Sequence, residues 1–201
     1  IGAEGTLGFV VEATMRLERA PKNLTAMVLG TPDFDSIMPV LHAFQDKLDL
    51  TAFEFFSDKA MAKIMGRGDV PAPFETECPF YALLEFEAIS EDIANDALAT
   101  FEHCVEQGWV LDGVMSQSQQ QLENLWKLRE FISETISHWT PYKNDISVTV
   151  GKVPAFLHDI DNIVGEHYPD FEIVWFGHIG DGNLHLNILK PENLSKDEFF
   201  A

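Results

Sequence analysis

The alternation of strand-like and helix-like segments is the sequence feature that most constrains the fold of this chain of 201 residues. Short apolar or alternating stretches are typical of strands, and apolar residues three and four positions apart are typical of helices. Between residues 25 and 116 the order is strand, helix, strand, short helix, strand, helix, strand. That is the order of a split βαβ, or ferredoxin-like, unit with one inserted helix. The expected strands are 25–31, 52–56, 81–88 and 110–116.

The second half of the chain has the order of an interrupted unit of the same kind. We expect a long helix from residue 117 to about residue 137, a helix over 153–167, and strands at 146–150, 172–178 and 184–189. The sequence ends before a last helix and strand would follow, so we expect this unit to be truncated. The predicted fold class is therefore α+β, an antiparallel sheet with helices packed on one face.

A glycine-rich hairpin carries the strongest functional signal. Residues 177–187 read GHIGDGNLHLN. With a turn of six residues, His178 and His185 would lie directly opposite each other, with Cβ atoms ~5 Å apart. Two imidazoles at that spacing can share one metal ion, and Asn187 would lie on the same face of its strand. The alternative is that both histidines are ordinary satisfied groups, and the spacing does not identify the third ligand that a metal needs.

Arg129 is the second signal, because it falls inside the apolar stripe of the expected long helix and has no acidic neighbour one turn away. An inward-facing guanidinium needs an anion. A substrate carboxylate, which arginine binds bidentately, is one candidate. The alternatives are that the side chain reaches water or pairs with one of the many acidic residues. Ser133, one turn further on, could donate a hydrogen bond beside it.

Lys143 is the third signal and stands at the mouth of the strand expected at 146–150. A lone lysine in a loop is usually solvated. Lys143 is therefore a candidate ligand-binding group only if it lies together with Arg129.

The charge balance excludes two classes of partner. The chain has 13 Lys and Arg against 33 Asp and Glu, a formal net charge of −20. Nucleic acid and anionic membrane surfaces both need basic clusters, which this sequence lacks. No apolar run approaches the ~20 residues of a membrane helix. Cys78 and Cys104 are far apart and form no CxxC pair, so we expect free thiols and a cytoplasmic location.

The first residues, IGAEGTLG, form a glycine-rich turn without an initiator methionine or a polar tail, and an alternating strand is expected at 9–17. Natural termini are usually polar and frayed. We therefore expect this chain to be a piece of a longer protein.

These motifs together resemble a known family. The opening IGAEGTLGFVVEATMRL, then LWKLRE, YKNDISV and FGHIGDGNLHLNI, are similar in order and spacing to the C-terminal portion of FAD-linked oxidases of the vanillyl-alcohol oxidase superfamily. The resemblance is greatest to the D-2-hydroxyglutarate and D-lactate dehydrogenase group. It implies that residues 1–20 are the terminal strand of an FAD-binding domain. It also implies that residues 21–201 are the substrate or cap domain, incomplete at its C-terminus.

The resemblance also assigns residues to a site. It implies that His178 and His185 bind a divalent metal, Zn²⁺ or Mn²⁺. The substrate-binding residues that it implies are Arg129, Ser133, Lys143 and Asn187. The stretch that it implies to contact FAD is Glu4, Gly5, Thr6, Leu7, Gly8, Phe9 and Val10. It places the third metal ligand and the base beyond the end of this chain, so no catalytic residue is assigned within it.

The implied reaction is oxidation of an (R)-2-hydroxy acid to the 2-oxo acid by an FAD-dependent dehydrogenase. A separate electron acceptor is expected, a homodimer is one assembly it could form, and the chain alone is expected to be inactive. Two other classes stay open: a non-catalytic small-molecule or metal-sensing module of ferredoxin-like fold, and a structural subunit of a larger oxidase.

Overall fold

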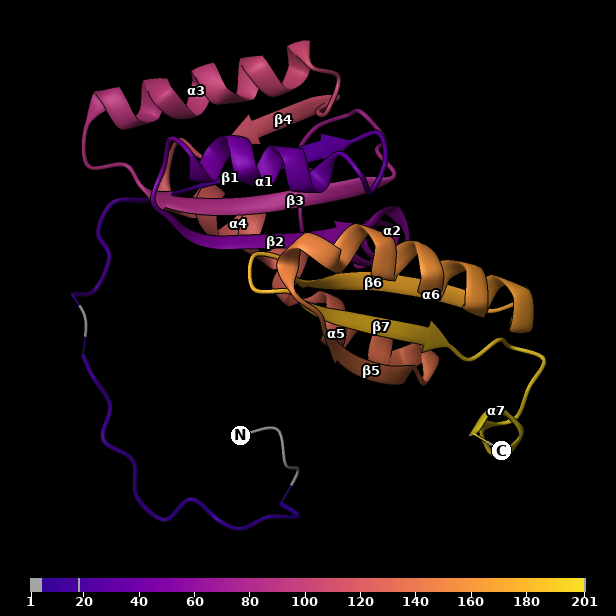
Figure 1. The fold of residues 1–201 in the computed structure, drawn as a ribbon. Coiled ribbons are helices and arrows are strands. Elements are labelled where there is room, and N and C mark those ends of the chain that lie inside the picture. The colour runs from indigo at the N-terminus through magenta and orange to yellow at the C-terminus, as the bar shows by residue number, and fades with distance from the viewer. Residues whose placement is uncertain (1–4, 18, 201) are drawn as a thin grey trace.

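The computed structural model describes residues 5–17 and 19–200, which contain a seven-stranded sheet in the order β4-β1-β3-β2-β6-β7-β5 (Figure 1). Every pair of neighbouring strands is antiparallel. The strands are β1 Leu24–Thr31, β2 Leu50–Ser57, β3 Phe80–Glu87, β4 Asp112–Met115, β5 Tyr142–Ser147, β6 Glu172–His178 and β7 Asn183–Leu189. The helices are α1 Ile37–Gln45, α2 Asp58–Met65, α3 Glu91–Glu106, α4 Gln119–Glu130, α5 Ile132–Ile136, α6 Val153–His167 and α7 Lys196–Phe200, with short 3-10 turns η1 Ser137–Trp139 and η2 Val150–Lys152.

The strand order contains the predicted ferredoxin-like unit. Strands β1 to β4 lie in the order β4-β1-β3-β2, as in a split βαβ fold, with α2 as the inserted helix. Strands β5 to β7 lie in the order β6-β7-β5, which corresponds to the first three strands of a second unit. The two parts join where β2 pairs with β6, at Phe55↔Gly177 and Phe56↔Phe176. The α+β class and the antiparallel sheet are confirmed.

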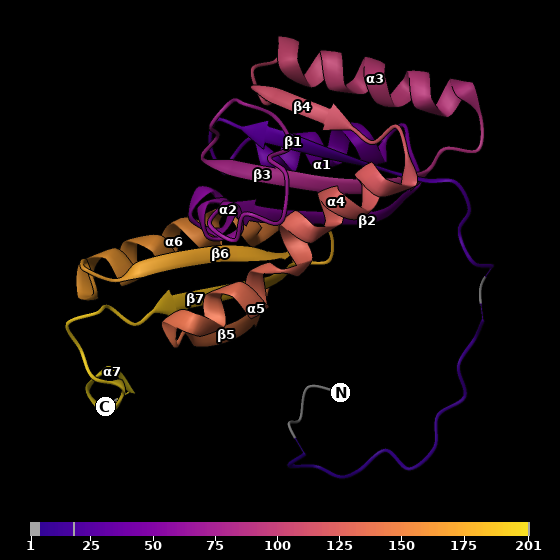
Figure 2. The ribbon, with the colours of Figure 1, turned by 180° about the vertical axis from the view of Figure 1, so that it is seen from behind.

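The helices cover both faces of the sheet, which differs from the expected packing on one face. Helices α1, α3 and α6 lie on one face, and α2, α4 and α5 lie on the other (Figures 1 and 2). The reason lies in the strands, which carry apolar residues on both sides: Val28 and Leu29 are adjacent in β1, and both are fully buried. Strands of that kind need cover on each face.

The N-terminal segment forms no strand, so the expectation of a strand at 9–17 is wrong for this structure. Its side chains are exposed, with Phe9 at 90% and Val11 at 95%, and it runs away from the sheet (Figure 1). A strand needs a neighbour for its backbone N–H and C=O groups, and residues 9–17 join no strand in the described part of the chain. The segment meets the sheet through an ion pair of Arg19 Nη2 with Glu87 Oε2 at 2.6 Å.

Two boundaries differ from expectation in ways that move functional residues. The expected long helix is broken at Phe131 into α4 and α5, so Arg129 and Ser133 lie on opposite sides of the break. Strand β5 begins at Tyr142, before the strand expected at 146–150, which places Lys143 in the sheet rather than in a loop. Among the described residues, no helix has the length and apolarity to cross a membrane.

Candidate functional site

The substrate- and metal-binding residues predicted from the sequence gather on one face of the sheet. Helices α2, α4 and α5 cover that face (Figure 2). His178 comes from β6, His185 and Asn187 from β7, and Lys143 from β5. Alternation puts His178 on the same face as Phe176, which is buried against these helices. Cross-strand pairing puts His185 opposite Phe176 and Lys143 opposite Asn187.

The hairpin register differs from the predicted one. His178 pairs with Asn183, and Phe176 pairs with His185, so the two histidines are diagonal neighbours and are not directly opposite. The turn spans residues 179–182, and within it Asp181 N donates to His178 O at 3.2 Å while Asp181 Oδ1 accepts from Asn183 N at 3.0 Å. Gly182 allows this tight turn with φ +78°, where an added Cβ would lie 2.1 Å from Val148 O.

The two histidines are nevertheless close and share a face. Their ring centroids lie 5.3 Å apart with an interplanar angle of 82°. His178 Nδ1 lies 2.7 Å from Glu54 Oε1, and His185 Nδ1 contacts Asp145 Oδ1. A carboxylate at Nδ1 fixes the tautomer in which Nε2 is a free lone pair, the usual support of a metal-binding histidine. In the part of the chain that the structure describes, neither Nε2 atom makes a hydrogen bond.

The electrostatics of His185 favour its neutral form. Burial lowers the pKa of His185, and the adjacent Asp145 carboxylate opposes that shift. Neutral imidazole is the form that binds a metal. The pair fits a divalent ion as two donors. However, within residues 5–17 and 19–200 no group of three or more His, Cys, Asp or Glu side chains could hold one.

Arg129 finds its anion inside the chain. Its Nε lies 2.9 Å from Glu54 Oε2, and each side chain is 8% exposed. The guanidinium lies over the ring of Phe176, with Cζ 4.8 Å from the centroid. Burial lowers the pKa of Arg129, and Glu54 opposes the shift. Three atoms of this pair, Arg129 Nε, Arg129 Nη2 and Glu54 Oε2, are buried and make no hydrogen bond in the described structure, so the contact is an ion pair rather than an aligned hydrogen bond.

Glu54 is a member of this cluster that the sequence reasoning missed, since it contacts both His178 and Arg129. The signal was present, because Glu54 is the charged residue in the otherwise apolar and hydroxyl-bearing strand LTAFEFFS. Alternation places it on the same face as Phe56. One of the alternatives for Arg129, pairing with an acidic residue of the chain, is therefore realised in this structure.

Ser133, Lys143 and Asn187 lie together beside the histidines. Lys143 Nζ donates to Ser133 Oγ at 3.1 Å, which links β5 to α5. Asn187 is 2% exposed, and its Nδ2 donates to the backbone oxygen of His185 at 3.3 Å. The structure thus brings six predicted residues, from five separate elements, onto one region of the sheet.

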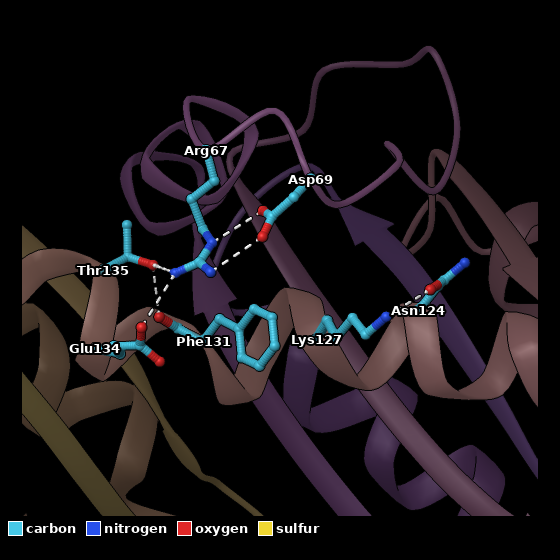
Figure 3. A network of polar contacts seen from close by, with 7 residues as sticks. All are labelled: Arg67, Asp69, Asn124, Lys127, Phe131, Glu134 and Thr135. Atoms are coloured by element: carbon cyan, nitrogen blue, oxygen red, sulfur yellow. Dashed lines mark hydrogen bonds and ion pairs between the residues drawn. The ribbon is translucent and has the colours of Figure 1, made fainter.

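A partly buried network centred on Arg67 lies beside the break between α4 and α5 (Figure 3). Arg67 Nε lies 3.0 Å from Asp69 Oδ1, and Arg67 Nη1 donates to Thr135 Oγ1 at 3.1 Å. The same guanidinium lies 4.7 Å from the ring centroid of Phe131. Asp69 raises the pKa of Arg67 further above its ordinary value.

The stretch expected to contact FAD lies apart from this cluster. Residues 5–10 belong to the exposed N-terminal segment (Figure 1), and Glu4 lies outside the described residues. Flavin contact by these residues therefore stays a prediction.

A cavity of about 900 Å³ lies elsewhere, between α2 and the loop that precedes β3. Its walls include Met61, Met65, Phe74 and Tyr81. None of the predicted site residues lines it. Chemistry, and not cavity size, therefore identifies the candidate site, since the convergent charged and imidazole groups lie on the histidine face.

Comparison with known proteins shows the family to which the chain belongs. Residues 20–198 match the family model of the C-terminal domain of FAD linked oxidases, and the chain belongs to that family. It is 88% identical over 201 residues to a D-2-hydroxyglutarate dehydrogenase of Stutzerimonas stutzeri (strain A1501), covering 100% of this chain and 43% of that protein. It is 51% identical to a D-2-hydroxyglutarate dehydrogenase of Xanthomonas citri pv. viticola, covering 100% of this chain and 42% of that protein.

A solved structure shows the same fold. An alkyldihydroxyacetonephosphate synthase superposes with a TM-score of 0.57 at 13% sequence identity, over 94% of this chain and 40% of that one. The chain spans about two fifths of the length of the curated relatives that it matches, 43% and 42% of the two described above.

Proposed function

We propose that this chain is the substrate- and metal-binding part of an FAD-dependent dehydrogenase that oxidises an (R)-2-hydroxy acid, D-2-hydroxyglutarate, to the 2-oxo acid. The observation that carries the proposal is the pair of carboxylate-supported histidines beside a cationic group and a hydroxyl, Lys143 and Ser133. The names of the relatives support the substrate class.

The cationic residues would bind and orient the substrate carboxylate. Lys143 supplies an exposed ammonium group, and Arg129 has buried Nε and Nη2 atoms that make no hydrogen bond among the described residues. In a chain with a net charge of −20 a local positive region is needed, because the acidic background repels anionic substrates. A carboxylate fixed at these groups would hold the substrate in one orientation, which is a large part of catalysis by positioning.

His178 and His185 would hold a divalent metal ion through their Nε2 atoms, with Zn²⁺ or Mn²⁺ as candidates. Such an ion, when bound, lowers the pKa of a coordinated hydroxyl group. FAD would supply the hydride acceptor for oxidation at C2 of the substrate. The hydroxyl proton passes to a base that we do not assign to any residue of this chain. Asn187 would orient the substrate beside the histidines.

The test is steady-state kinetics on the full-length protein that carries this chain, loaded with FAD, with a dye as electron acceptor. D-2-hydroxyglutarate should be oxidised in preference to D-lactate, and a chelator should abolish turnover. Lys143→Met should raise KM for the hydroxy acid by about 10-fold or more, as expected for loss of a charged hydrogen-bond donor. Lys59→Met, at an exposed position of α2, is the matched control.

Two outcomes would overturn the proposal. Full-length protein that binds metal but oxidises no 2-hydroxy acid would favour a metal-sensing module. Turnover by these 201 residues alone would show that oxidation does not need a separate flavin-binding part, contrary to the proposal.

A further inference from the structure

We infer that Glu54 is a positioning residue that holds the metal-binding histidine and the carboxylate-binding arginine in register with each other. The inference rests on the proposed function, because it gives Glu54 a role toward the metal and the substrate. It goes beyond that function, because Glu54 itself touches neither group and comes from a different strand.

The backbone places Glu54 between its two partners. Phe55 pairs with Gly177 where β2 meets β6, so Glu54 lies opposite His178 on the helix-covered face. Helix α4 crosses that face and brings Arg129 within reach, at 2.9 Å from Nε to Oε2. Oε1 lies 2.7 Å from His178 Nδ1 and is hydrogen-bonded to it, whereas Oε2 faces Arg129 as an ion pair in which neither Oε2 nor Nε makes a hydrogen bond.

This arrangement needs a carboxylate. An ionised carboxylate accepts on both oxygens, whereas the amide of glutamine accepts on one and donates on the other. Glutamine at position 54 could therefore satisfy His178 or Arg129 but not both. Freed from an acceptor at Nδ1, the imidazole of His178 can reverse its tautomer and lose the lone pair at Nε2.

The same contact decides which atoms of Arg129 are available. Glu54 Oε2 faces Nε as an ion pair without a hydrogen bond, and the ring of Phe176 lies against the guanidinium plane. Nη2 is left buried and without a partner among the described residues. A guanidinium fixed at Nε presents its terminal nitrogens in one direction, which suits the planar recognition of a carboxylate.

Positioning and simple charge make opposite predictions here. Glu54 neutralises Arg129, so removing its charge makes the region more positive. If Glu54 acted only through charge, Glu54→Gln would strengthen binding of an anionic substrate. If it positions Arg129, the same variant weakens that binding although the region has become more positive.

The experiment compares Glu54→Gln with Glu85→Gln in the full-length holoprotein. Glu85 is a matched control, because it is a second buried glutamate on the same face, in the neighbouring strand β3, with Trp126 and Thr51 as partners. After chelation, Zn²⁺ and Mn²⁺ are titrated calorimetrically. Glu54→Gln should weaken metal binding by about 10- to 100-fold, the usual effect of losing a carboxylate behind a ligating histidine. It should also raise KM for D-2-hydroxyglutarate, and Glu85→Gln should change neither.

A second variant keeps the test usable if Glu54→Gln does not fold. Glu54→Gln/Arg129→Met leaves no unpaired buried charge, and its metal affinity should still fall by the same factor. In a His178→Gln background, Glu54→Gln should cause no further loss of metal affinity, because its effect passes through His178.

The outcomes separate the two proposals. Equal metal affinity in Glu54→Gln and wild type, or a lower KM in Glu54→Gln, overturns the positioning role and leaves the proposed function intact. Wild-type protein that binds neither ion and oxidises no hydroxy acid overturns the proposed function, and the positioning role with it.

Discussion

On the face covered by α1, α3 and α6, the polar side chains buried among the described residues are hydroxyl groups such as those of Thr31 and Thr100, whereas the face covered by α2, α4 and α5 buries Glu54, Glu85 and Arg129. The same strands supply both faces. Ala82, Leu84 and Phe86 of β3 point to the apolar side, for example, while Glu85 points to the other.

The two faces are stabilised in different ways, one by specific pairing of buried charges and the other by close apolar packing. A buried charge costs free energy unless it is paired. The charged face meets that requirement with specific partners: Arg129 with Glu54, and Glu85 with Trp126 Nε1 at 2.7 Å. The apolar face needs only close packing, so its residues can differ in detail without altering any ligand-binding group.

The largest expected effect is the loss of a charge partner. Arg129→Met leaves Glu54 buried with His178 as its remaining neighbour, so the free energy of unfolding should fall by about 3–5 kcal/mol. Urea denaturation measures the change. Glu54→Leu/Arg129→Met should recover most of the loss, because replacing a buried pair by apolar groups is often neutral. A double variant less stable than either single variant would show that the pair is not the reason for the cost.

A substitution on the apolar face should destabilise the protein, and no second substitution of a partner should be able to compensate for it. Leu41 of α1 is fully buried, and Leu41→Ala should lower the free energy of unfolding by about 2–5 kcal/mol through lost transfer energy and a cavity. Metal and substrate affinity, measured in the folded population, should be unchanged. A fall in metal affinity as large as the one expected for Glu54→Gln would show that the apolar face also affects ligand binding.

A single hydrogen bond on the charged face should be worth less. Trp126→Phe removes the donor to Glu85 and keeps most of the aromatic packing, so stability should fall by about 1.5–3 kcal/mol, as for hydrogen bonds to charged groups. Thermal unfolding is a sufficient measurement. Trp175→Phe is the counterpart on the other face, since Trp175 donates to Asp161 at 2.8 Å. A larger loss of stability in Trp175→Phe than in Trp126→Phe would show that hydrogen bonds to charged groups do not matter more on the charged face.

Periodicity explains why the order of elements could be predicted. Each strand carries its own alternating or apolar pattern, and those patterns suffice for the ferredoxin-like order β4-β1-β3-β2. The packing of helices α2, α4 and α5 on the second face of the sheet could not be predicted from periodicity. Leu83 and Glu85 share that face, and the charged residue obscured the apolar signal.

The candidate site was predictable in its members but not in its connections. Motif spacing identifies His178 and His185, yet the hairpin register goes with a turn that also contacts distant residues, such as Gly180 N with Phe53 O and Val148 N with Gly182 O. Likewise Arg129 is visible as a charge in an apolar stripe, while its partner Glu54 lies on a strand far away in sequence. Contacts between distant segments are decided by packing, which no local pattern records.

The smallest expected effect is a pH dependence confined to the charged face. Burial lowers the pKa of His185 in the folded chain, below the ~6.5 of an unfolded histidine. The unfolded chain therefore takes up the proton first as the pH falls. The contribution of His185 to stability should be fully present above about pH 6.5 and should be lost as the pH falls through the lowered folded pKa. Urea midpoints measured with a chelator between pH 5 and 8 would show this decline, and His185→Gln should flatten it. An unchanged slope in His185→Gln would assign the decline to other groups.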